Sequence, residues 1–168
     1  ESAYQLCRKL KIPYFIIDLS PAFEEKIINH FCDSYLQGIT PNPCIECNKK
    51  IKFGLFLKKA EMLGADFMAT GHYCRIEKEK NSNIFQVLKG ADRSKDQSYV
   101  FWKLDQSQLS RIRTPIGNFT KENIKKMSKD FIPDLASKDE SQDICFIPNQ
   151  NYQDFLGKKA TSIKEGKI

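Results

Sequence analysis

Residues 40–53 read TPNPCIECNKKIKF and place Cys44 and Cys47 on a proline-stiffened loop ahead of an amphipathic helix. Each proline fixes its own φ and favours an extended conformation in the residue before it, so the segment before Cys44 is expected to be stiff and non-helical. We expect the helix to begin near Cys47 or Asn48. A thiol there would lie beside unpaired backbone N–H groups and the positive end of the helix dipole, which favour the thiolate.

Two lysines, Lys49 and Lys50, follow Cys47 and add positive charge near its thiol. Positive surroundings lower the pKa of a cysteine and make it a nucleophile. A second thiol, Cys145, lies far along the chain in SQDICFIPN, residues 141–149. We therefore predict that Cys47 and Cys145 meet in the fold and carry out redox-linked sulfur chemistry.

The rest of the chain alternates helical patterns with short apolar runs. Apolar residues recur at helical spacing in five segments, which predict helices over 2–11, 20–37, 53–63, 120–131 and 152–156. Ser20 and Thr120 are expected N-caps, and Gly38 and Gly64 are expected helix stops. Strands are expected at 14–18, 66–70 and 84–88, the last outside the parallel core. This alternation predicts an α/β fold, a parallel sheet flanked by helices.

The sequence Thr70-Gly71-His72-Tyr73 follows directly after the expected strand 66–70. Ligands of parallel α/β sheets bind beyond the carboxyl ends of the strands. This position favours ligand contact by His72, although a hydrogen-bonded structural histidine is the alternative. The polar loop that holds Lys95, Asp96 and Gln97 allows two interpretations as well, a solvated surface or contacts to phosphates and base edges.

Composition limits the class of protein. With 168 residues, 40% hydrophobic and 29% charged, the chain has the composition of one globular domain or a large part of one. The net charge of +6 is a weak indication of a polyanionic partner. No apolar run approaches the roughly 20 residues that a membrane helix needs. The six cysteines, without a secretory leader, favour free thiols in a reducing compartment, and hence the cytoplasm, with an organelle as the alternative.

The C-x-x-C pair has other interpretations. Zinc would need four ligands, and only Cys44 and Cys47 are spaced for it. A thioredoxin-like motif normally follows a strand directly, whereas here a proline-rich loop intervenes. Both thiols could also be buried structural residues, and Cys145, flanked by apolar neighbours, could be a core cysteine in a strand.

Four stretches taken together resemble one known family. TPNPCIECNKKIKF, LGADFMATGHYCRI, ADRSKDQSYVFWKL and SQDICFI are similar, in order and spacing, to the tRNA-specific 2-thiouridylases, the MnmA/TrmU family. The resemblance covers residues 12–156. It implies an adenine-nucleotide alpha-hydrolase-like catalytic domain (PP-loop, Rossmann-like), with residues 1–157 as part of it and 158–168 as a linker. The family's Ser-Gly-Gly-x-Asp-Ser pyrophosphate loop is absent, so we expect an incomplete domain with no thiolation activity by itself.

The resemblance implies that the wobble uridine (position 34) of tRNA is activated by adenylation with ATP and Mg²⁺, after which sulfur replaces its 2-oxygen. By resemblance, Cys47 is the nucleophile and Cys145 carries the persulfide. Gly71 falls on the ATP-binding turn. Positions that match tRNA contacts are Asn42, Pro43, Cys44, His72, Lys95, Asp96 and Gln97. The implied partners are tRNA and a sulfur-donor protein, and the cycle would end with a Cys47–Cys145 disulfide. Many members carry Asp at the position of Cys44, which leaves the role of this thiol open.

Two other functions compete with a thiouridylase. One is a small binding module switched by zinc or by redox state, without catalysis. The other is a different ATP-dependent enzyme, sulfur-inserting or amidating, on a similar sheet.

Overall fold

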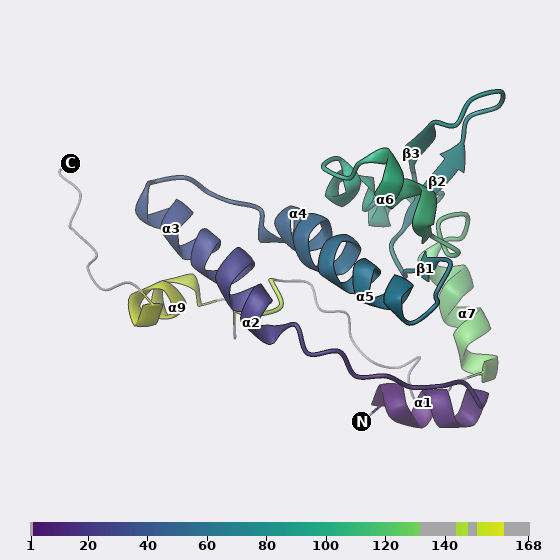
Figure 1. Ribbon diagram of the computed structural model, residues 1–168, viewed down its shortest axis with the longest axis horizontal. Helices are drawn as coiled ribbons and strands as arrows, with labels where there is room; N and C mark the ends of the chain where they lie inside the picture. Colours follow the sequence, from purple (N-terminus) through teal and green to yellow (C-terminus); the bar gives the residue numbers. More distant parts are fainter. Residues whose placement is uncertain (1, 132–143, 148–150, 160–168) are drawn as a thin grey trace.

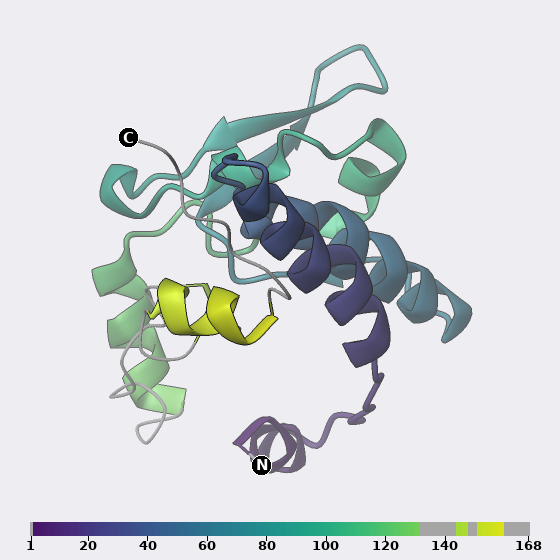
Figure 2. The same cartoon turned by 90° about the vertical axis from the view of Figure 1, so that its left-hand side faces the viewer.

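The computed structural model describes residues 2–131, 144–147 and 151–159 (Figure 1). Two long helices form its centre. The first is continuous through α2 (Ser20–Phe23), η1 (Glu24–Asn29) and α3 (His30–Leu36), and the second through α4 (Pro43–Cys47), η2 (Asn48–Phe56) and α5 (Leu57–Met62). They pack against each other where η1 contacts α4, and Figures 1 and 2 show them side by side.

The ends of these helices follow local sequence. Gly38 and Gly64 end them with φ of 76° and 86°, a backbone region that glycine adopts without steric cost, as predicted. Ser20 does not act as the N-cap that the sequence predicted. Leu19 holds that position, and the Asp18 Oδ1 instead accepts a hydrogen bond from the Ser20 backbone N–H at 2.8 Å.

The parallel sheet is one pair of short strands in the part of the chain that the structure describes. Strand β1 (Met68–Ala69) pairs in parallel with β4 (Ile112–Arg113), and the Thr70 N–H donates to the Arg113 carbonyl at 2.9 Å. A strand at 66–70 was predicted, whereas β4 was not. Strands β2 (Cys74–Lys78) and β3 (Phe85–Lys89) form a separate antiparallel pair, so β3 lies outside the parallel pair as expected.

The prediction of a buried strand at 14–18 is wrong. These residues belong to no strand, and Phe15 and Ile16 are 66% and 81% exposed. A strand needs a neighbour to accept and donate its backbone hydrogen bonds. No described strand lies beside this segment, so its apolar sequence alone does not produce one.

The remaining helices surround this centre. They are α1 (Ser2–Leu10), η3 (Arg93–Lys95), η4 (Ser98–Phe101), α6 (Gln106–Arg111), α7 (Lys121–Phe131) and α9 (Tyr152–Lys159). Three of them, α1, α7 and α9, were predicted. The Thr120 hydroxyl accepts from the Asn123 N–H at 3.2 Å and caps α7 as expected. None of the described helices is both long enough and apolar enough to cross a membrane.

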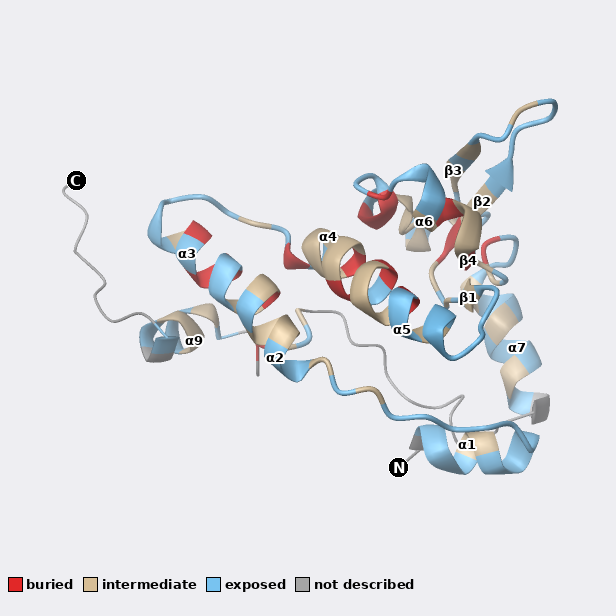
Figure 3. Cartoon of the chain, viewed as in Figure 1, coloured by how far each residue is buried: buried red, intermediate tan, exposed pale blue. Residues whose placement is uncertain are grey.

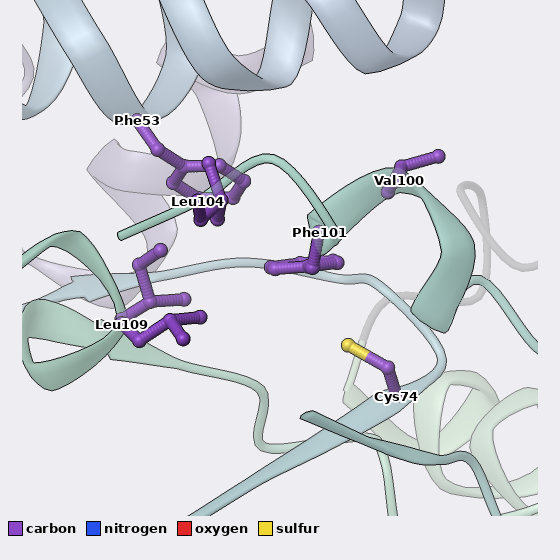
Figure 4. Close-up of a cluster of buried hydrophobic side chains, with 7 residues drawn as sticks. Phe53, Cys74, Val100, Phe101, Leu104 and Leu109 are labelled. Carbon is purple, nitrogen blue, oxygen red and sulfur yellow. The ribbon is translucent and has the colours of Figure 1, made fainter. Parts of the chain in front are cut away.

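Two hydrophobic clusters stabilise the arrangement. The central cluster joins the second long helix to the hairpin, η4, α6 and β4, and consists of Phe53, Cys74, Val100, Phe101, Leu104, Leu109 and Ile112 (Figure 4). The aromatic cluster lies on the first long helix and has Phe31, Cys32 and Ile147 buried at its centre. Buried residues accordingly lie on the inner faces of the two long helices (Figure 3). The linker predicted at 158–168 lies almost wholly outside the described residues.

Candidate active site

Three of the six cysteines line one small cavity. Its volume is about 190 Å³, and its walls are Phe23, Ile27, Pro43, Cys44, Cys47, Asn48, Lys52, Ile144, Cys145 and Phe146. The structure therefore brings Cys145 to the same cavity as the C-x-x-C pair, although almost one hundred residues separate them in sequence. All three thiols are free. The cavity wall is otherwise apolar, apart from one cation and one amide.

The prediction of a low pKa for Cys47 is wrong. Helix α4 begins at Pro43 with Asn42 as its N-cap, so Cys47 lies one turn inside the helix. Burial raises the pKa of the Cys47 thiol above its ordinary value, and only Lys52 opposes this effect. The two lysines expected to help are engaged elsewhere. Lys49 binds Asp105, and Lys50 binds Glu46.

Cys145 is held at the cavity by its aromatic neighbour. Phe146 packs edge-on against Phe31 at 5.3 Å and Phe23 at 5.7 Å between ring centroids, and it also contacts Phe155. Ile147 is buried in the same cluster. Cys145 itself is exposed. It is therefore not the core cysteine of the alternative interpretation, whereas Cys32 and Cys74 are buried.

The loop that precedes Cys47 builds the start of the helix. The Asn42 Oδ1 accepts from the backbone N–H groups of Cys44 at 3.1 Å and Ile45 at 3.4 Å, the usual bonding of an N-cap. Pro43 is buried, and Cys44 is exposed at the cavity. Asn42 thus has a structural role in addition to any contact with RNA.

Asn48 is a residue of the cavity that the sequence did not single out. It is only 2% exposed, and its Nδ2 donates to the Cys44 carbonyl oxygen at 2.8 Å. Its Oδ1 is the one buried side-chain polar atom without a hydrogen-bond partner among the described residues. In the sequence, only its position directly after Cys47 could have indicated that Asn48 lines the cavity.

Glu46 fixes the helix that carries the cysteines. Its carboxylate binds Lys50 at 2.9 Å within the helix and also binds Lys103, which follows η4. The Glu46 side chain is 15% exposed, so these ion pairs are partly shielded from solvent. The pair with Lys103 holds Glu46 against a different part of the chain and limits rotation of α4 about its axis.

Gly71 and His72 lie at the carboxyl end of β1. A Cβ atom built on Gly71 would meet nothing within 4 Å, so there is open space beside this glycine. His72 contacts Phe101 at 5.1 Å between ring centroids, and its Nδ1 is 2.7 Å from the Thr70 hydroxyl. Burial, with a smaller effect of Lys52, lowers the pKa of His72 to about 4. These contacts give His72 a structural role in addition to any contact with a ligand.

The loop that carries Lys95, Asp96 and Gln97 is tied to the hairpin. The Asp96 Oδ1 accepts from the Gly90 N–H at 2.8 Å, and the Gln97 Oε1 accepts from the Tyr73 N–H at 3.0 Å. These side chains therefore hold a loop in place and are not merely solvated. Across residues 2–131, 144–147 and 151–159, no three His, Cys, Asp or Glu side chains gather closely enough to hold a metal ion.

Helices around a parallel strand pair, with an open glycine turn at the end of its first strand, define an α/β domain of the nucleotide-binding type. The chain belongs to the tRNA methyl transferase HUP domain family, which matches residues 1–149. This match confirms the predicted fold class and the family resemblance.

Curated relatives of the chain carry a more specific name. It is 43% identical over 166 residues to the tRNA-specific 2-thiouridylase MnmA of Syntrophomonas wolfei, a match that covers 99% of the chain and 48% of the relative. It is 42% identical to the protein of that name from Carboxydothermus hydrogenoformans, covering 98% and 45%. The MnmA 2 of a Thermoanaerobacter species is 44% identical, covering 100% and 46%. The chain thus spans about half the length of these relatives.

Proposed function

We propose that the chain is part of the catalytic domain of a tRNA 2-thiouridylase, a sulfurtransferase that replaces the 2-oxygen of the wobble uridine with sulfur. The observation that carries this proposal is the cavity shared by Cys47 and Cys145. The relatives' name supports it. Residues 1–157 would belong to the catalytic domain and 158–168 to a linker, and the enzyme would work in the cytoplasm, on the tRNAs modified there.

The chemistry needs two sulfur atoms within reach of each other. Cys145 would carry a persulfide, Cys–S–SH. The Cys47 thiolate attacks the inner sulfur of that persulfide, forms a Cys47–Cys145 disulfide and releases hydrosulfide. Hydrosulfide then adds to C2 of the adenylated uridine, and AMP leaves with the former 2-oxygen. In the alternative route the persulfide attacks C2 directly and Cys47 then cleaves the sulfur–sulfur bond. Both routes end in the same disulfide, which a two-electron thiol reductant reopens.

The raised pKa of Cys47 fits a resting enzyme whose thiol is mostly protonated. Lys52 is the cation that lowers this pKa, and it lines the same cavity. A thiolate formed during the reaction would therefore have a positive partner in an otherwise apolar site. The exposure of Cys145 supports its loading by an external sulfur-donor protein.

ATP and tRNA are the other proposed substrates. The open backbone at Gly71 supports a nucleotide at the end of β1, with Mg²⁺ as its expected counter-ion. For the polyanionic tRNA, a wide groove beside the second long helix is lined by five cations, Lys26, Lys49, Lys50, Lys58 and Arg111, against two acids, Glu61 and Asp105. Four of these cations are ion-paired, Lys26 with Glu25, Lys49 with Asp105, Lys50 with Glu46 and Arg111 with Glu61. The proposed attraction for phosphates therefore depends on the net charge of +6 of the chain. Contacts of Asn42, Pro43, Cys44, His72, Lys95, Asp96 and Gln97 with tRNA complete the proposal.

Two measurements test the proposal. In the chain itself, mild oxidation with diamide should link Cys47 to Cys145, detected by mass spectrometry of peptides. In the full-length protein, Cys47→Ser and Cys145→Ser should each abolish 2-thiouridine formation, whereas Cys32→Ser, a buried thiol outside the cavity, should retain it. Full 2-thiouridine formation by Cys145→Ser would refute the proposed roles of the two cysteines. The same conclusion would follow if the Cys47–Cys145 crosslink did not form under conditions that oxidise the other thiols completely.

A further inference from the structure

We infer that Asn48 determines which pyrimidine the cavity accepts, because its free Oδ1 receives a hydrogen bond from the N3–H group of the target uracil. This inference rests on the proposed function and goes beyond it, since neither the sequence patterns nor the cysteine chemistry assigns a role to Asn48.

The Asn48 amide has one orientation that its surroundings allow. The Cys44 carbonyl oxygen can only accept, so the amide nitrogen must face it, and the 2.8 Å contact is an N–H···O bond. The Oδ1 then faces the other way and finds no donor. A buried acceptor without a partner destabilises a fold by about 1–3 kcal/mol, so a native structure that retains one has a reason for it.

The thiols do not supply the missing donor. Cys44, Cys47 and Cys145 line the same cavity as Asn48, yet none of them donates a hydrogen bond to the Oδ1. Among the described residues the Oδ1 therefore has no donor, and in our inference the bound base supplies it. The cavity has a volume of about 190 Å³, several times the roughly 30 Å³ that one water molecule occupies in the liquid.

The target base carries a donor in the right place. The atom that exchanges oxygen for sulfur is C2, and N3 is bonded directly to C2. A uracil seated with C2 toward Cys47 and Cys145 therefore brings its N3–H group to the same wall, where Asn48 follows Cys47 in the helix. Cytosine has an unprotonated N3 at this position, which can only accept. Facing the Asn48 Oδ1, it would leave two acceptors opposed and both unpaired.

The test uses the full-length protein and two short anticodon stem-loop RNAs that carry uridine or cytidine at the target position. Asn48→Leu keeps the approximate size of the side chain and removes the acceptor. We expect it to lower 2-thiolation of the uridine RNA by roughly tenfold or more, and to lower the uridine-to-cytidine binding ratio by a similar factor. The persulfide content of Cys145 should not change.

Ser34→Ala is the matched control. Ser34 is also buried, at 7% exposed, and also donates to a carbonyl one turn earlier, His30 O at 2.7 Å, but it lies outside the cavity. Its variant should leave the ratio unchanged. A wild-type enzyme that does not thiolate uridine RNA refutes the proposed function itself. If the wild type is active and Asn48→Leu leaves the uridine-to-cytidine binding ratio unchanged, the role of Asn48 is refuted and the proposed function stands. The same holds if Asn48→Leu lowers only the persulfide content of Cys145.

Discussion

The burial of His72 predicts a stability that falls in mild acid. Its pKa is about 4 in the folded chain, against an ordinary value of 6.5. Between these values the unfolded chain binds a proton that the folded chain does not, so the free energy of unfolding decreases as pH falls from 6.5 toward 4. The difference of 2.5 pH units corresponds to about 3 kcal/mol, with most of it lost by pH 4.5.

Urea unfolding at pH 7.5 and pH 4.5 measures this contribution. Carboxylates also lose stability in acid, so the quantity of interest is the difference between wild type and His72→Gln. We expect the pH-dependent loss in wild type to exceed that in His72→Gln by about 2–3 kcal/mol. Equal pH dependence in wild type and His72→Gln would refute the assignment of a buried neutral imidazole, and with it the structural role of this ring.

Three further predictions concern local features. Gly117→Ala should destabilise the chain by about 1–3 kcal/mol in urea, because its Cβ would lie 1.9 Å from the Cys74 carbonyl oxygen. Gly71→Ala, with open space at the same atom, should unfold as wild type does, and equal effects of the two would contradict the described turns. Asp105→Ala removes the capping box of α6 and should lower the free energy of unfolding by about 1 kcal/mol, whereas Asp105→Asn should retain most of it. Cys47 should react with iodoacetamide at pH 7 more slowly than a free cysteine peptide does, because burial raises its pKa, and a faster reaction would contradict this.

The sequence predicted best those elements whose formation depends on neighbouring residues alone. The helices around 20–37 and 53–63, with their glycine stops, follow from apolar spacing and from the φ that only glycine adopts freely. Strands depended on partners that no local pattern reveals. The apolar run at 14–18 forms no strand, and the two-residue strand Ile112–Arg113 was missed because it is defined by pairing with β1.

The sequence likewise predicted only some features of the candidate site. The meeting of Cys47 and Cys145 at one cavity was expected, but the electrostatics around Cys47 were not. Sequence proximity suggested that Lys49 and Lys50 would stabilise its thiolate, whereas Lys49 binds Asp105 and Lys50 binds Glu46. Asn48 escaped notice because an unsatisfied acceptor is a property of the packed fold.

The ion pairs of Glu46 imply an unequal division of motion between the two sulfurs. Glu46 precedes Cys47 and is bound by Lys50 of the same long helix and by Lys103 of another part of the chain, so a turn of the helix would break the ion pair with Lys103. Beside Cys145, Phe146 makes edge-on contacts with Phe23 and Phe31, and Ile147 is buried in the same cluster. Because Cys145 is exposed and Cys47 lies on a helix tied to Lys103, we expect Cys145 to make the larger movement when the two sulfurs meet.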